Sequence, residues 1–105
     1  MDARNEHPLK MTLNGREINR LVIDQHYKAK HRDMDDRLIV SLVKTLDGDN
    51  YPIEMENDGF EYFTVEPVEY LEKNYRLVLV MCITEDFLGV INAFRVRRKN
   101  DKVSK

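Results

Sequence analysis

Residues 60–96 read FEYFTVEPVEYLEKNYRLVLVMCITEDFLGVINAFRV and carry the clearest pattern in the chain. Apolar and polar side chains change from a helical spacing to a period of two after Gly59, which is typical of β-strands. We predict strands over Phe60–Glu66, Tyr75–Ile83 and Leu88–Val96. The turns that separate them are short, so the strands should form an antiparallel meander with Tyr75–Ile83 in the centre.

Two helices are expected before these strands. The first is predicted over 16–32, after the turn signal Asn14-Gly15, because apolar residues there recur at spacings of three and four. The second is predicted over 34–46, with acidic residues in its first turn and Gly48 just beyond its end. The fold class that follows is α+β, with two N-terminal helices packed on a small antiparallel β-sheet, a meander of three or more strands.

The length and composition indicate one globular domain. The chain has 105 residues, of which 42% are hydrophobic and 34% charged. We expect a single domain over 1–105, with a core of about 11–98 and flexible termini at 1–8 and 99–105. The one cysteine excludes an intramolecular disulfide and a multi-cysteine metal site. No apolar leader or membrane span is visible, so a cytoplasmic location without membrane contact is expected.

Charge is unevenly distributed along the chain. Residues 1–32 have a net charge of +3, residues 33–74 of −9, and residues 75–105 of +4. If the two basic ends meet in space, they form a surface that attracts phosphate groups. The alternative is that the basic tail after Val96 is only a solvated terminus.

Several segments together resemble a known group of proteins. They are His26-Tyr-Lys-Ala-Lys-His31, the helix end Leu46-Asp-Gly48, and the strand segments Tyr75-Arg-Leu-Val-Leu-Val80 and Val90-Ile-Asn-Ala-Phe-Arg95. In this order, over about residues 16–97, they resemble the barnase/EndoU/colicin/RelE-like group of small ribonucleases, found as bacterial toxins and phage-associated domains. The resemblance implies an endoribonuclease that needs no metal or other cofactor. The acidic segment 33–74 and an isoelectric point of about 5.9 depart from the basic character of such toxins.

Cleavage of RNA without a metal needs a base, an acid and a cation for the phosphate. Histidine suits both proton-transfer roles near neutral pH, so His26 and His31 are the candidate acid and base. On one continuous helix these two side chains would diverge, so a shared site requires the helix to end or bend near His31. Arg95, between apolar strand residues, is the candidate phosphate ligand. The plainer alternatives are a His26 at the edge of the core, a solvated His31, and an Arg95 paired with the acidic segment.

Further residues are candidates for holding the substrate. Basic and amide side chains would contact phosphate or base edges, and an aromatic ring on a strand can stack on a base. These candidates are Lys30, Arg32, Tyr62, Arg76, Asn92 and Arg97. Aromatic residues in strands more often only pack, and Asn92 more often secures a loop.

Two functions from different classes remain open at this point. The first is a metal-independent endoribonuclease of the toxin type that acts on RNA, with a cognate immunity or antitoxin protein as a partner. The second is a non-catalytic protein, immunity-like, antitoxin-like or a small adaptor, whose acidic segment 33–74 binds a basic partner. The sequence does not determine the oligomeric state.

Overall fold

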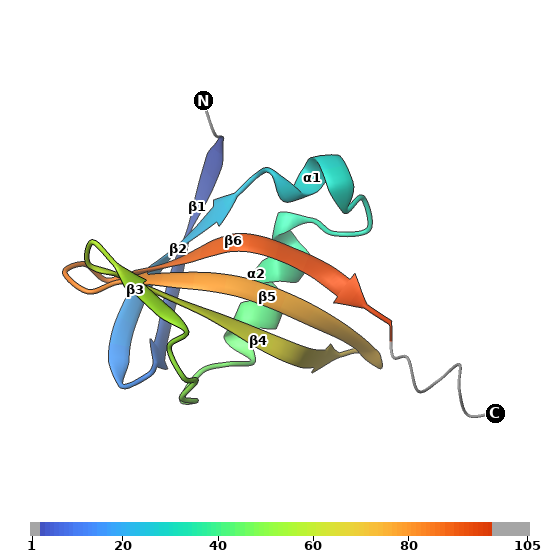
Figure 1. Cartoon of the computed structure of the whole chain (residues 1–105). Helices are drawn as coiled ribbons and strands as arrows, with labels where there is room; N and C mark the ends of the chain where they lie inside the picture. Colours follow the sequence, from blue (N-terminus) through green and yellow to red (C-terminus); the bar gives the residue numbers. More distant parts are fainter. Residues whose placement is uncertain (1–2, 98–105) are drawn as a thin grey trace.

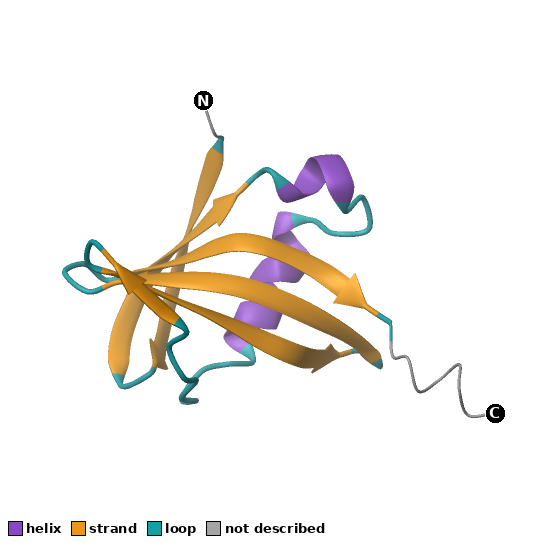
Figure 2. Ribbon diagram, in the orientation of Figure 1, coloured by secondary structure: helices purple, strands orange, loops and turns teal. Residues whose placement is uncertain are grey.

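A computed structural model describes residues 3–97 as six strands and two helices (Figures 1 and 2). They are, in chain order, β1 (Arg4–Leu13), β2 (Arg16–Asp24), α1 (Tyr27–Lys30), α2 (Asp36–Lys44), β3 (Met55–Asn57), β4 (Phe60–Tyr70), β5 (Lys73–Cys82) and β6 (Phe87–Val96). The strands form one sheet in the order β1-β2-β6-β5-β4-β3. β2 runs parallel to β6, and every other neighbouring pair is antiparallel.

The predicted fold class is wrong at the N-terminus, where a β-hairpin replaces the helix expected over 16–32. Asn14 and Gly15 both have positive φ angles, 53° and 74°, which is the geometry of a two-residue hairpin turn. The pairing of β1 with β2 is irregular between Pro8 and Met11. Because alternation breaks there, Ile18 and Leu21 are both buried, and their spacing of three imitates a helix. The protein is therefore mostly a mixed sheet with two short helices.

The second predicted helix is confirmed as α2. Asp35 caps its N-terminus by accepting a hydrogen bond from the Leu38 backbone N–H at 2.8 Å. Its buried face, which includes Ile39, Leu42 and Val43, packs against the sheet, and the main core lies between them.

The predicted C-terminal meander is confirmed as β4–β5–β6, with β5 between its two neighbours. The alternation of β6 is interrupted, because Val90 pairs with Leu79 whereas Asn92 pairs with Val78. This register shift leaves Ile91 as an extra residue, so Val90 and Ala93 face the core and Asn92 faces the other side.

The two faces of the sheet differ in their cover. α2 lies behind the sheet in Figure 1 and covers one face, whereas the face toward the viewer carries no helix over its centre. We call this second face the open face. The predicted flexible terminus 1–8 overlaps β1, which begins at Arg4, and the predicted terminus 99–105 lies outside the described residues. Within residues 3–97, neither helix is long and apolar enough to cross a membrane.

Candidate functional site

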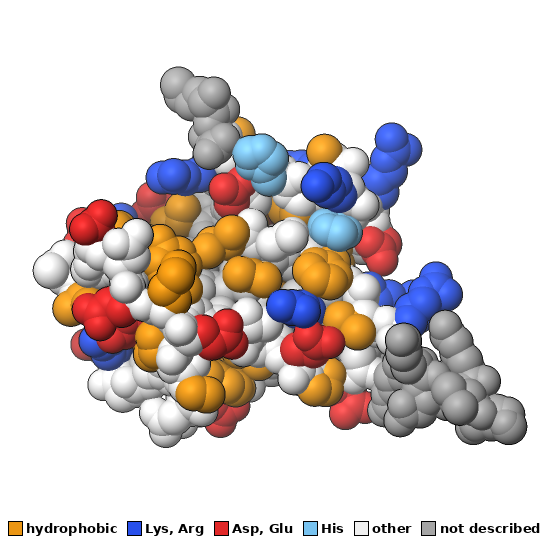
Figure 3. All heavy atoms as spheres, viewed as in Figure 1, with side chains coloured by type: hydrophobic (Ala, Val, Ile, Leu, Met, Phe, Trp, Pro, Cys, Tyr) orange, Lys and Arg blue, Asp and Glu red, His pale blue; other side chains and the backbone are white. Residues whose placement is uncertain are grey.

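Two depressions adjoin each other on the open face. The smaller, of about 220 Å³, is here called the histidine pocket and is lined by Asp24, His26, Tyr27, Lys30, His31, Ile91 and Asn92. The larger, of about 300 Å³, is called the aromatic depression and is lined by Arg4, Val22, Asp24, Phe60, Tyr62, Val80, Phe87, Gly89, Val90 and Ile91. Asp24 and Ile91 border both. Figure 3 shows hydrophobic side chains gathered on this face, with histidines along the border toward α1.

The shortness of α1 brings the two histidines to one pocket. His26 is the residue before α1 and His31 is the residue after it, and the helix between them has only four residues. His31 leaves helical geometry, with φ −126° and ψ 77°. The helix therefore ends at Lys30, just before His31, as a site shared by both histidines requires. Lys30, the last helical residue, lines the same pocket.

Each histidine ring has a defined neighbour. The Nδ1 atom of His26 lies 3.2 Å from Asp24 Oδ1, and the same oxygen accepts a hydrogen bond from the His26 backbone N–H at 2.9 Å. The His31 ring stacks on the Phe94 ring of β6, with centroids 5.0 Å apart and planes inclined by 20°. The His26 side chain is 71% exposed, so solvent and ligands can reach it. These contacts fix one ring to β2 and the other to β6.

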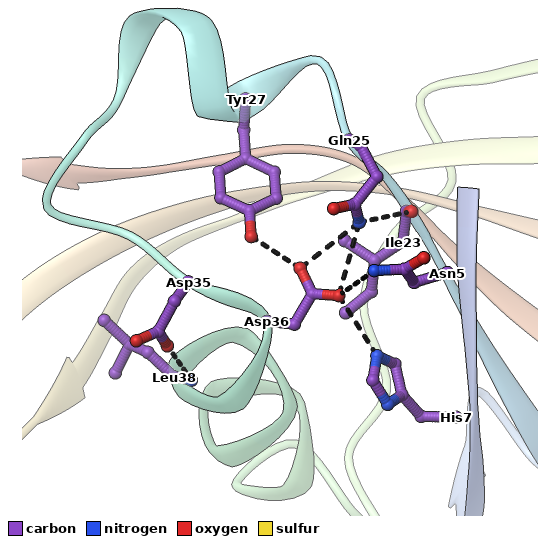
Figure 4. A network of polar contacts seen from close by, with 8 residues as sticks. All are labelled: Asn5, His7, Ile23, Gln25, Tyr27, Asp35, Asp36 and Leu38. Carbon is purple, nitrogen blue, oxygen red and sulfur yellow. Dashed lines mark hydrogen bonds and ion pairs between the residues drawn. The ribbon is translucent and has the colours of Figure 1, made fainter. Parts of the chain in front are cut away.

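A cluster of hydrogen bonds around Asp36 anchors this region (Figure 4). The Asp36 carboxylate accepts hydrogen bonds from Tyr27 Oη at 2.5 Å, Asn5 Nδ2 at 2.8 Å and Gln25 Nε2 at 3.2 Å. His7 Nε2 lies 3.2 Å from the same carboxylate. The donors come from β1, the segment before α1, and α1 itself. Asp36 on α2 therefore fixes the position of α1, which carries the histidine pocket.

The Asp36 cluster changes the acidity of its members. Burial alone would raise the pKa of Asp36, but the hydrogen bonds, with the one from Tyr27 the largest among them, outweigh it and lower the pKa to about 2. Burial, together with the neighbouring Asp36 carboxylate, raises the pKa of the Tyr27 hydroxyl. The sequence indicated Asp36 only as an acidic residue in a first helical turn. No local signal revealed its partners, because Asn5 and His7 are about thirty residues away.

The structure places the other predicted site residues in different surroundings. Tyr62 lines the aromatic depression and Asn92 lines the histidine pocket, where the Asn92 Oδ1 atom accepts a hydrogen bond from the Ala93 backbone N–H at 2.9 Å. Arg76 lies with its guanidinium carbon 5.9 Å from the Phe94 ring centroid and pairs with Glu66 at 3.3 Å. Arg32 and Arg97 are exposed and line neither depression.

Arg95 does not join the histidines. It pairs in register with Tyr75, whose side chain is buried on the face that α2 covers, and directly opposite residues of antiparallel strands share a face. Phe94 pairs with Arg76 on the open face beside His31. Arg95 therefore lies on the side of the sheet away from the histidine pocket.

The two basic parts of the sequence do meet, because β2 lies next to β6. Three of their described arginines, Arg16, Arg20 and Arg76, pair with acids. Arg20 lies within 3.5 Å of Glu6, Glu85 and Asp86, and its guanidinium is 5.4 Å from the Phe87 ring centroid. Lys30 is the cation that lines the histidine pocket. The basic tail after Arg97 lies outside the described residues.

Within residues 3–97, no group of three His, Cys, Asp or Glu side chains is placed to hold a metal ion. The candidate site thus consists of two imidazoles, one ammonium group, one carboxylate and an adjoining aromatic surface. Comparisons of the chain with protein-family models, with curated proteins and with solved structures found no match.

Proposed function

We propose that this chain is a metal-independent endoribonuclease that binds RNA on the open face and cleaves it at the histidine pocket. The observation that carries the proposal is the gathering of His26, Lys30 and His31 around one pocket. Imidazole can act as base or acid near neutral pH, and a lysine ammonium can neutralise a phosphate. The proposal agrees with the activity that the resemblance to small ribonucleases implies, but it is supported by side-chain placement and not by the order of the elements.

The chemistry would be an internal transesterification. The ribose 2′-oxygen attacks the neighbouring phosphorus and gives its proton to His26, while the bond from phosphorus to the 5′-oxygen breaks and His31 protonates that leaving oxygen. The products are a 2′,3′-cyclic phosphate and a 5′-hydroxyl. Asp24 beside His26 Nδ1 would stabilise the imidazolium that forms, as a carboxylate does in other proton-transfer pairs. Lys30 takes the role first considered for Arg95, because Arg95 lies on the opposite face.

The test is a cleavage assay on single-stranded RNA in EDTA. We expect the wild type to release cyclic phosphate ends, and the His26→Ala/His31→Ala double variant to be slower by about 100-fold or more. Arg95→Ala is the matched control and should cleave like the wild type. Circular dichroism must show that each variant is folded. The proposal is abandoned if the wild type does not cleave, or if the double variant cleaves equally fast.

A non-catalytic binding function is the second candidate, and exposed acids at the two ends of β4 favour it. Glu56, Asp58, Glu69 and Glu72 are exposed around β3 and the β4–β5 turn. Other acids of segment 33–74 already serve the fold: Asp47 accepts from the Thr12 backbone N–H at 2.8 Å, and Glu54 from that of Thr64 at 3.2 Å.

This candidate predicts a salt-sensitive complex with a lysine- and arginine-rich peptide of 20 residues. A Glu56→Gln/Asp58→Asn variant should bind the peptide more weakly than the wild type, measured by calorimetry at low and high salt. Equal binding by both proteins would remove the support for a partner at these acids.

A further inference from the structure

The register of the sheet lines up a row of small and apolar side chains across the open face. Val22 pairs with Gly89, Gly89 with Val80, and Val80 with Tyr62. Residues that pair in register stand side by side on one face. This row crosses four neighbouring strands and forms the floor of the aromatic depression.

Gly89 lies at the centre of the floor, directly against Val80. Its φ is not in the left-handed region, so its backbone does not require a glycine. The space above it does: a Cβ at this position would stand 2.7 Å from Val80 Cγ1. A glycine inside a strand commonly marks a place where a ligand approaches the backbone closely. Because position 89 has no side chain, the Val80 side chain can lie close against the backbone there, and the floor contains no larger side chain between Val22 and Val80.

The walls and one end of the depression have distinct chemistry. Phe60, Tyr62 and Phe87 are half-buried aromatic side chains along it. Arg4 and Asp24, which pair in register on β1 and β2, line the end nearest the histidine pocket. Asp24 Oδ1 is occupied by His26, whereas Asp24 Oδ2 makes no hydrogen bond with residues 3–97. That oxygen is an acceptor for a ligand N–H.

We infer that the aromatic depression is a subsite for one purine base of a bound nucleic acid strand. A purine offers a larger ring for stacking on aromatic side chains than a pyrimidine does. Every base presents an N–H₂ or N–H group that can donate to the Asp24 carboxylate lining the depression, so the preference for a purine comes from the larger stacking surface. A volume of about 300 Å³ holds a single base with its sugar, not a longer segment. The inference rests on the proposed function, because Asp24 joins this subsite to the histidine pocket where the phosphate would lie.

The test uses deoxyribonucleotide tetramers, which lack the attacking hydroxyl and so report binding without cleavage. Amide signals of Tyr62, Val80 and Gly89 are followed by NMR during titration with all-adenine and all-thymine tetramers. We expect the adenine tetramer to bind about fivefold or more tightly and to shift these signals. Tyr62→Leu should lose this preference. Tyr70→Leu, a change at another half-buried tyrosine of the same strand that does not line the depression, should keep it.

The outcomes separate this inference from the proposed cleavage. Equal affinity for both tetramers, signal shifts confined to other parts of the sheet, or a preference that survives Tyr62→Leu would overturn the purine subsite, even if RNA is cleaved. A preference for adenine that depends on Tyr62 supports the subsite even if the wild type fails to cleave RNA, in which case only the catalytic proposal is lost. Binding of free adenosine monophosphate without binding of the tetramer would also overturn a subsite for a strand.

Discussion

Asp36 couples the stability of the protein to acid pH. Its side chain is only 16% exposed, and its pKa is about 2 when folded, against an ordinary value of 3.8. The folded state therefore binds a proton more weakly than the unfolded chain. This contribution is fully present above about pH 4 and is lost as the pH falls through 2. It amounts to about 2 kcal/mol.

We expect Asp36→Asn to reduce the free energy of unfolding at pH 7 by about 2 kcal/mol and to flatten its dependence on pH between 4 and 2. Urea unfolding at several pH values measures both effects. Asp33→Asn, at an exposed position in the preceding loop, is the control and should leave the pH dependence close to that of the wild type. An Asp36→Asn protein with the wild-type slope in this range would show that the cluster does not hold the carboxylate ionised.

Tyr27 is the residue through which Asp36 positions α1. Its ring is buried and its hydroxyl donates to Asp36 Oδ1. We expect Tyr27→Phe to lower the free energy of unfolding by about 1–2 kcal/mol, since a buried carboxylate loses a donor. Because the histidines flank Tyr27, RNA cleavage should also fall in the folded variant. Thermal unfolding and the cleavage assay, with Tyr70→Phe as the control, measure the two effects separately; a variant with unchanged stability contradicts the anchoring role.

Within the strand pair β5–β6, Gly89 lies directly opposite Val80, and the Val80 side chain fills the space beside it. Gly89→Ala brings a methyl group against Val80 Cγ1, and valine has few alternative rotamers. We expect a loss of about 1–3 kcal/mol in the free energy of unfolding. Shortening the partner should relieve the clash, so adding Gly89→Ala to a Val80→Ala protein should cost much less. Additive losses in this double-mutant cycle would place the strain elsewhere.

The elements that sequence patterns predicted are those with regular periodicity. Alternation identified the three strands of the meander, and the acidic first turn together with Gly48 beyond the end identified α2. The N-terminal hairpin was missed although Asn14-Gly15 is a strong hairpin signal, because the irregular pairing of β1 and β2 produced a helical spacing. The spacing of three between Ile18 and Leu21 arose because both side chains are buried at the bulge, and not because the segment forms a helix.

The candidate site was only partly predictable for a related reason. His26, Lys30 and His31 lie within six residues, so a short helix sufficed to bring them together. Arg95 was expected to share a site with the histidines, but it lies on the other face of the sheet, because the extra residue Ile91 changes the alternation of β6 and Arg95 pairs with Tyr75. The contacts of Asp36 depend on how β1 packs against α2. Local sequence patterns do not indicate which residues meet across such a long separation in the chain.

Over the whole molecule, some positions along the described edges of the sheet are blocked to further strands. On β1, Thr12 exchanges hydrogen bonds with Asp47 and Gly48, and Pro8 lacks a backbone N–H. On β4, Glu54 accepts from the backbone N–H of Thr64 next to the end of β3. Edge-to-edge pairing is therefore disfavoured. The open face has no helix over its centre and carries both depressions of the candidate site.

The N-terminal hairpin joins the meander through the parallel pairing of β2 with β6, and Arg20 reinforces that seam. Arg20 contacts Glu85 at 3.0 Å and Asp86 at 3.2 Å, and Asn19 donates to Asp86 through its side chain at 2.9 Å and through its backbone at 2.8 Å. The hydrogen bond from Asn19 is the main cause of a lowered Asp86 pKa, and Arg20 adds to it. These partners are solvent-accessible, so salt should weaken the ion pairs.

We expect Arg20→Met to make the protein less stable at low salt and to reduce the difference between low and high salt, because the wild type loses these ion pairs at high salt anyway. The effect should be local. Amide hydrogen exchange should accelerate in β1 and β2, while amides in the β4–β5 pairing keep their protection, since the meander retains its own antiparallel hydrogen bonds and its cover by α2. Arg37→Met, at an exposed position on α2, is the control. Uniform acceleration in all six strands would instead show that hairpin and meander open as one cooperative unit, and that the seam is no weaker than the rest of the sheet.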